Sequence, residues 1–170
     1  TTPWTLIGNV ALAVGNDIDY VKIEVEDGKY IIATELVKNY HKELGENPKV
    51  LEKYSGRDLV GKKVKPLFDY YYNDKELANK ENGWQIYAAD FVTTEEGTGI
   101  VHMAPAFGED DMVLGKVNNM PFIQHVAMDG SINAEATDFT GLNVKPKDDH
   151  TSTDVAIIKY LAGKGLLFAK

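Results

Sequence analysis

The 170-residue chain contains no cysteine. This absence excludes disulfides, thiolate zinc sites and a cysteine nucleophile, and it favours the cytoplasm as the compartment. No run of about eighteen apolar residues occurs, which excludes a membrane-spanning helix. We therefore expect a soluble, cytoplasmic protein without a membrane partner.

Positive charge is also scarce, because 18 Lys and Arg residues stand against 26 Asp and Glu residues and give a formal net charge of -8. A surface of this charge repels a phosphate backbone, so we do not expect the chain to bind nucleic acid by itself. If RNA is a partner, a terminal nucleotide or a neighbouring domain must supply most of the affinity.

The motifs of several common enzymes are missing. The sequence holds neither HExxH nor G-x-S-x-G, so nothing supports a zinc protease or an α/β-hydrolase. Gly163-Lys164-Gly165 resembles a phosphate loop, but the glycine that this motif requires five residues before Gly163 falls on Ile158. A phosphate loop is therefore excluded.

The composition is that of a globular protein, with 44% hydrophobic and 10% aromatic residues. A chain of this length can bury one core, so we predict a single domain over residues 1–170, and a monomer is the simplest expectation. The opening residues TTPWT include no initiator Met and no signal segment. This start suggests a segment of a larger protein.

Apolar residues recur with the periods of short strands and a few helices. Asp27-Gly28 predicts a hairpin turn, and Thr151 with Asp154 has the spacing of a capping box. Many short strands with scattered helices favour an α+β or β-barrel-like domain over a doubly wound sheet. The predicted strands span residues 6–14, 20–25, 29–33, 50–54, 63–67, 84–89 and 99–103, and the predicted helices span residues 34–44, 109–117 and 155–161.

Residues 69–83 are predicted to form a surface excursion that includes three consecutive tyrosines, Tyr70 to Tyr72. Such tyrosines could stack on a nucleobase, but in a β-rich domain half-buried packing is the commoner role. We favour packing and leave them outside the site.

Residues 97–111, GTGIVHMAPAFGEDD, combine His102 with three consecutive acids. These acids and His102 could form a metal site with His125, but nothing fixes their spacing. Acids at the start of a helix also have a structural role, because they complement the helix dipole. A metal site is therefore the less favoured interpretation, and we predict no metal or other cofactor in this domain.

Two parts of the sequence together resemble a known family, the editing domain (connective peptide 1) of isoleucyl-tRNA synthetase. The first is TTPWTL at residues 1–6, followed by Asn9. The second is GTGIVH at residues 97–102, followed by Ala104-Pro105 and GEDD. Leucyl and valyl relatives usually read Thr-Thr-Arg-Pro at the first part and carry Met or Lys in place of His102. The resemblance covers nearly the whole chain and implies an α+β, β-barrel-like editing domain with peripheral helices, inserted in a larger class I synthetase.

The resemblance implies hydrolysis of mischarged valyl-tRNA(Ile), and also of valyl-adenylate, in a pocket that admits valine and excludes isoleucine. One methylene changes binding by only ~1–3 kcal/mol, and isoleucyl-tRNA synthetases are the usual illustration of this limit. The partners implied are the 3'-terminal aminoacyl-adenosine of tRNA(Ile) and the remainder of the parent synthetase.

The residue types in these motifs suit hydrolysis of an aminoacyl ester. The resemblance makes Asp111 the anchor of the substrate's α-ammonium group, although a first-turn acid is its structural alternative. Threonine hydroxyls could hold a water and the ester carbonyl, although ordinary strand packing is their alternative. His102 would limit side-chain size, although a packed histidine is its alternative. The predicted catalytic residues are Thr1, Thr2 and Asp111, and the predicted substrate-binding residues are Thr1, Thr2, Thr5, Asn9, His102, Ala104 and Asp111.

Two other functions stay open at this point. The chain could be a non-catalytic module that only positions the tRNA acceptor end, or it could be a metal-dependent hydrolase. Discrimination between valine and isoleucine distinguishes the first from an editing enzyme, and sensitivity to a chelator distinguishes the second.

Overall fold

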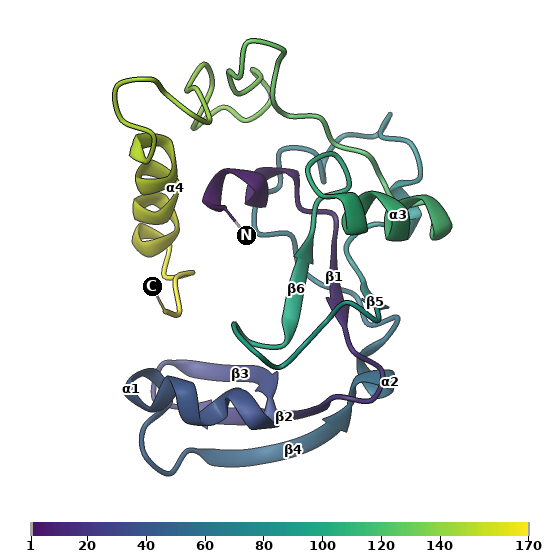
Figure 1. Cartoon of the computed structure of the whole chain (residues 1–170), viewed down its shortest axis with the longest axis vertical. Coiled ribbons are helices and arrows are strands. Elements are labelled where there is room, and N and C mark those ends of the chain that lie inside the picture. Colours follow the sequence, from purple (N-terminus) through teal and green to yellow (C-terminus); the bar gives the residue numbers. More distant parts are fainter. Residues whose placement is uncertain (1, 170) are drawn as a thin grey trace. The chain divides into compact units, whose positions relative to one another are not determined.

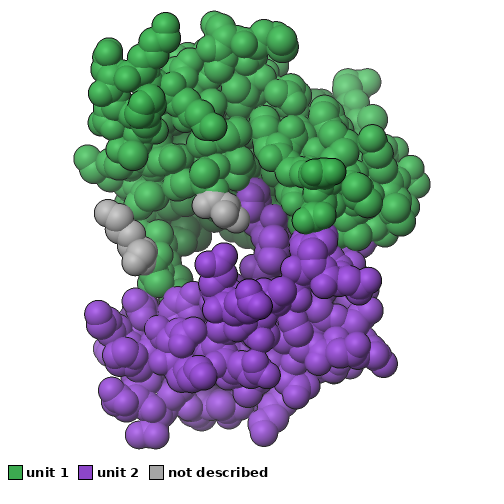
Figure 2. All heavy atoms as spheres, viewed as in Figure 1, with its two compact units in different colours: residues 1–10, 65–83, 103–170 green, residues 11–64, 84–102 purple. Residues whose placement is uncertain are grey.

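The computed structural model describes residues 2–169, so the prediction that Thr1 takes part in the site lies outside the described residues. The chain divides into two compact units, each built from segments distant in sequence (Figure 2). The first unit comprises residues 1–10, 65–83 and 103–170, and the second comprises residues 11–64 and 84–102.

The second unit contains an antiparallel sheet of order β3-β2-β4 (Figure 1). The period-two alternation predicted β2 (Asp19–Val25), and the Asp27-Gly28 turn signal predicted its hairpin with β3 (Gly28–Ala33). β4 (Lys49–Ser55) pairs on the other side of β2. All three predicted strands are confirmed.

The predicted helix at residues 34–44 is a 3-10 helix, η2 (Thr34–Tyr40), followed by one α-helical turn, α1 (His41–Leu44). The spacing of Val37 and Tyr40 fits either kind of helix, which is why the pattern did not separate them. Gly45 follows with a φ of 79° and ends the helix. η2 packs on β2 and β3 through the buried Leu36.

A second sheet has the order β5-β1-β6, with β1 (Ala11–Val14) parallel to β5 (Ile86–Ala88). β6 (Ile100–Met103) confirms the strand expected before the GEDD sequence. The fully buried Tyr20 joins the two sheets, because its hydroxyl donates to the Gly99 carbonyl at 2.7 Å and accepts the Gly15 N–H at 3.1 Å. The fold is thus α+β, with two three-stranded sheets.

Two predicted strand regions are wrong. Of the strand predicted at residues 6–14, only Ala11–Val14 is a strand, because Pro3–Gly8 forms a 3-10 helix, η1, with Pro3 in its first turn. Residues 63–67 contribute only an isolated bridge between Lys63 and Gln85. Pro66 lies in this segment, and proline cannot donate a ladder hydrogen bond.

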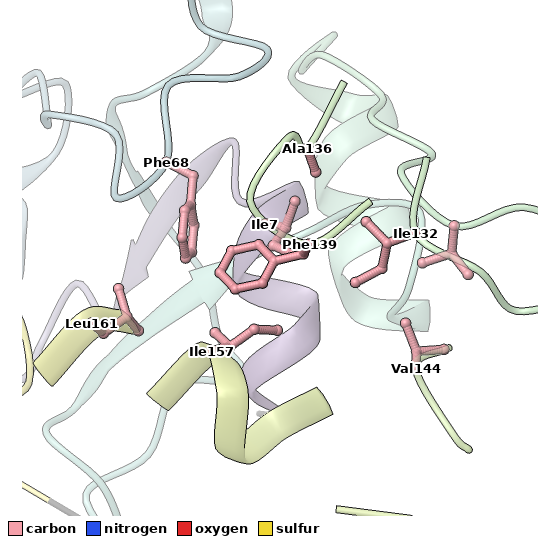
Figure 3. Packing of buried hydrophobic residues seen from close by; sticks show 9 residues of the cluster. Ile7, Phe68, Ile132, Ala136, Phe139, Val144, Ile157 and Leu161 are labelled. Atoms are coloured by element: carbon pink, nitrogen blue, oxygen red, sulfur yellow. The ribbon is translucent and has the colours of Figure 1, made fainter. Parts of the chain in front are cut away.

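The core of the first unit gathers around α4 (Ser152–Gly163), which is longer than the predicted helix at residues 155–161. Ile157 and Leu161 of α4 meet Ile7 of η1 and two phenylalanines, Phe68 and Phe139 (Figure 3). The predicted capping box at Thr151 is wrong, because the Thr151 side chain makes no capping hydrogen bond to α4. The Asp154 carboxylate instead accepts the backbone N–H of Trp4.

The excursion at residues 69–83 consists of turns and a short 3-10 helix, η3 (Lys80–Asn82). Tyr70 stacks on Phe68 with ring centroids 5.7 Å apart and donates to Asp138. Tyr71 is half-buried against the same core, whereas Tyr72 is exposed. The packing interpretation is confirmed for Tyr70 and Tyr71.

The remaining helices are short. α2 (Gly56–Leu59) follows β4 and begins with a complete capping box between Ser55 and Asp58. α3 (Glu109–Val117) has the bounds predicted from the sequence. Within residues 2–169, none of the helices is both long and apolar enough to cross a membrane.

Of the glycines in the second unit, Gly56 has the least room for a Cβ, and we predict that Gly56→Ala destabilises the protein. A Cβ at this position would lie 1.9 Å from the Gly15 carbonyl oxygen, so the backbone must move. We expect a loss of about 1–3 kcal/mol or more in the free energy of unfolding, measured by urea denaturation. Gly163→Ala is the matched control, because a Cβ there meets nothing within 4 Å. Equal unfolding midpoints for the two variants would contradict this account.

Candidate functional site

The predicted threonines lie on residues 2–8, here called the threonine turn, which comprises Thr2 and η1. The Thr5 backbone N–H and hydroxyl both donate to the Thr2 carbonyl, at 3.1 Å and 2.8 Å. Thr2 is exposed, and its side chain does not cap η1. The alternative that Thr2 and Thr5 are ordinary threonines of a β-strand is therefore wrong, because this segment is not a strand.

Side chains from two distant segments hold Trp4 of the threonine turn. Its backbone N–H donates to Asp154 Oδ1 at 3.1 Å, and its carbonyl lies 3.0 Å from His125 Nε2. Because a carbonyl only accepts hydrogen bonds, Nε2 must be the protonated ring nitrogen. The Trp4 ring also packs edge-on against Phe107, with centroids 5.0 Å apart.

The residues that follow the threonine turn pair with the end of β6. The Val10 N–H donates to the Met103 carbonyl at 2.9 Å, and Asn9 Nδ2 lies 3.5 Å from the same oxygen. Met103 and Ala104 are buried. These contacts bring the first sequence motif beside the second.

Asp111 differs from the other two acids at the start of α3. Glu109 and Asp110 are exposed, whereas Asp111 is half-buried and its Oδ2 accepts the Ala104 N–H at 2.7 Å. Burial raises the pKa of Asp111, the neighbouring Asp110 charge adds to this, and the Ala104 N–H opposes it. A Cβ on Gly108 would lie 2.9 Å from Asp111 Oδ1, so a larger residue at position 108 would displace this carboxylate.

His102 lies in β6 and is half-buried. Burial lowers its pKa to about 4, so the imidazole is neutral near pH 7. A neutral imidazole with this pKa is a weak base. This state agrees with a role in shaping a pocket better than with a role as general base.

The first unit thus brings together Thr2, Thr5, Asn9, Ala104 and Asp111, while His102 is the last residue of the second unit. Their roles stay predictions. Sequence reasoning missed His125 and Asp154 as supports of the threonine turn, and no local signal marks them because they lie 121 and 150 residues from Trp4. Across residues 2–169, no three His, Asp or Glu side chains are placed to hold a metal ion.

Known proteins similar to this chain are isoleucine–tRNA ligases. The chain is 46% identical over 153 residues to that of Rickettsia felis, covering 88% of this chain and 13% of the relative. It is 42% identical over 157 residues to that of Bdellovibrio bacteriovorus, covering 91% of this chain and 14% of the relative. The Mycobacterium tuberculosis protein shares 42% identity over 144 residues. The chain therefore spans about 13% of the length of these relatives, and no protein-family model matches it.

Among solved structures, the crystal structure of GlLeuRS-CP1 matches this chain with a TM-score of 0.52 and 18% sequence identity. The match covers 68% of this chain and 39% of the other. Identity this low supports the fold alone. The chain therefore has the α+β fold of a CP1 editing domain.

The buried His125 makes stability depend on pH, and we predict that the free energy of unfolding falls as the pH drops from about 6.5 to about 4. Burial lowers the pKa of His125 from 6.5 to about 4 in the folded chain. Between these pH values the unfolded chain binds a proton at His125 and the folded chain does not, which lowers the free energy of unfolding by about 3 kcal/mol in total. Urea denaturation of the wild-type chain and of His125→Gln across this range measures the difference. If both lose the same stability, His125 is not its source.

Proposed function

Because this chain is a homologue of one segment of the isoleucine–tRNA ligases, we propose that it removes valine from mischarged valyl-tRNA(Ile) by hydrolysis. The observation that carries the proposal is the half-buried Asp111 carboxylate, which accepts the Ala104 N–H. The residue before Ala104, Met103, is hydrogen-bonded to Val10, which follows the threonine turn in sequence. The 3'-terminal aminoacyl-adenosine and the rest of the synthetase are the proposed partners, in the cytoplasm. Valyl-adenylate is a second proposed substrate.

Asp111 is proposed to bind the α-ammonium group of the substrate. Its Oδ2 is fixed by the Ala104 N–H, which leaves Oδ1 as an acceptor for a charge-assisted hydrogen bond. Burial raises the Asp111 pKa, and an incoming cation offsets this by favouring the charged carboxylate. An acid already oriented by the backbone loses little freedom when the substrate binds.

The threonine turn is proposed to hold the attacking water against the ester carbonyl. The Thr5 hydroxyl donates to the Thr2 carbonyl, and because a hydroxyl oxygen is also an acceptor, Thr5 is proposed to accept a hydrogen bond from the water. The water oxygen bonds to the carbonyl carbon, the bond from that carbon to the ribose oxygen breaks, and the ribose oxygen takes the proton that the water loses. Because aminoacyl esters are labile, positioning contributes much of the rate without a strong base or a covalent intermediate.

The selection of valine is proposed to be steric. A pocket that binds isoleucine cannot reject valine by more than ~1–3 kcal/mol, so a second, smaller pocket must admit the valyl ester and hydrolyse it. The neutral side chain of His102 is the proposed wall that excludes isoleucine, and Asn9 and Ala104 are proposed to bind the substrate. No metal or other cofactor enters this mechanism.

We predict that Asp111→Asn slows the hydrolysis of valyl-tRNA(Ile) by about 10- to 100-fold. The amide can still accept the Ala104 N–H but cannot offer a negative charge, and a hydrogen bond to a charged group is worth about 1.5–3 kcal/mol. Release of labelled valine from pre-charged tRNA measures the rate. Asp110→Asn is the matched control, because Asp110 is exposed and should leave the rate unchanged. A wild-type rate of hydrolysis in Asp111→Asn would contradict the assignment of Asp111 as the residue that binds the α-ammonium group.

We also predict that His102→Ala admits isoleucine. The smaller side chain enlarges the pocket, so hydrolysis of isoleucyl-tRNA(Ile) should rise while that of the valyl ester persists. The ratio of the two rates is the measurement. A variant that still rejects isoleucine would place the wall elsewhere, and a chain that binds valyl and isoleucyl analogues equally would be a positioning module.

A further inference from the structure

The peptide groups on either side of Trp4 are held from both directions by side chains. Its N–H donates to Asp154 of α4, and its carbonyl accepts from His125. All three residues belong to the first unit. Within that unit, Trp4 lies between Thr2 and Thr5, so these two bonds fix the backbone that carries both proposed water-binding threonines.

His125 occupies a buried position next to the threonine turn. Its side chain is 0% exposed, and its ring packs edge-on against Phe107 with centroids 4.7 Å apart. Among residues 2–169, the other ring nitrogen, Nδ1, has no hydrogen-bond partner. A Cβ on Gly8 would lie only 2.8 Å from this Nδ1, so glycine at position 8 lets the imidazole approach the threonine turn.

A core position that only fills space does not need a ring with a buried, unsatisfied nitrogen, because such a nitrogen costs free energy. Phenylalanine would fill a similar volume without that cost. The feature that histidine adds here is one directed N–H donor, and that donor meets the Trp4 carbonyl. The chemistry therefore points to placement of the turn rather than to packing alone.

We propose that His125 is a positioning residue of the hydrolytic site, which sets the threonine turn through the Trp4 carbonyl. This inference rests on the function proposed above. His125 does not touch the substrate; it places Thr2 and Thr5, which hold the water. Asp111 is supported separately by Ala104, so loss of the His125 donor should impair turnover while leaving the capture of the substrate ammonium intact.

Two substitutions of His125 separate donor from volume. His125→Phe keeps a buried ring but removes the donor, whereas His125→Gln places an amide N–H near the position of Nε2. We expect His125→Phe to lower kcat for valyl-tRNA(Ile) about 10-fold or more with KM changed less than about 3-fold, and His125→Gln to recover most of kcat. His150→Gln is the control, because His150 is exposed.

A second readout does not depend on activity. Amide hydrogen exchange of residues 2–8 should speed up in His125→Phe and stay near wild type in His125→Gln. Wild-type exchange and kcat in His125→Phe would overturn the inference, as would equal losses in both variants. If His125→Phe fails to fold, Asp154→Ala and Asp154→Asn give the same comparison at the Trp4 N–H, because only asparagine keeps an acceptor there. If the two variants show the expected exchange pattern but the wild-type chain does not hydrolyse the ester, the proposed function fails, and only the support of the threonine turn by His125 stands.

Discussion

The hydrogen bonds that hold Trp4 are the constraint on which the candidate site depends. A 3-10 helix has poorer hydrogen-bond geometry than an α-helix and is rarely as long as Pro3–Gly8, so this segment needs support from tertiary contacts. His125 and Asp154 supply that support at successive peptide groups, and the Trp4 ring adds contact with Phe107. The segment with the predicted chemistry is therefore ordered by residues far away in the sequence.

The second half of the site is ordered in a different way. Asp111 starts α3, and its carboxylate turns back to accept the Ala104 N–H only seven residues away in sequence. Gly108 leaves space for the carboxylate, and the buried Met103 and Ala104 anchor the loop at the end of β6. One half thus rests on local contacts and the other on long-range ones, and the pairing of Val10 with Met103 joins them.

The sequence predicted the elements that depend on local signals. Alternation and the Asp27-Gly28 turn are properties of neighbouring residues, and they located β2 and β3, while the three acids located α3. Prediction was wrong where another element decides the conformation. Pro3 and the buried Ile7 belong to η1 rather than to a strand, and Asp154 binds Trp4 instead of capping its own helix.

Only those site residues that belong to the two sequence motifs could be predicted. Asp111 and the threonines were identified through a family resemblance, and the structure shows that Asp111 contacts Ala104 and that Thr5 contacts Thr2. His125 was considered from sequence only as a metal ligand, since no spacing rule links it to a residue 121 positions away. Its contact with Trp4 depends on the burial of Gly8 and on the packing of Phe107, and neither can be read from local pattern.

The central claim is that Asp111 recognises the α-ammonium group of an aminoacyl ester. The most direct test compares the affinity of the chain for a non-hydrolysable valyl-adenosine analogue and for the same analogue without its amino group. A charge-assisted hydrogen bond worth about 1.5–3 kcal/mol predicts that the amino group tightens binding by about 10- to 100-fold, and that Asp111→Asn removes this advantage. Equal affinity for the two analogues in the wild-type chain would contradict the account.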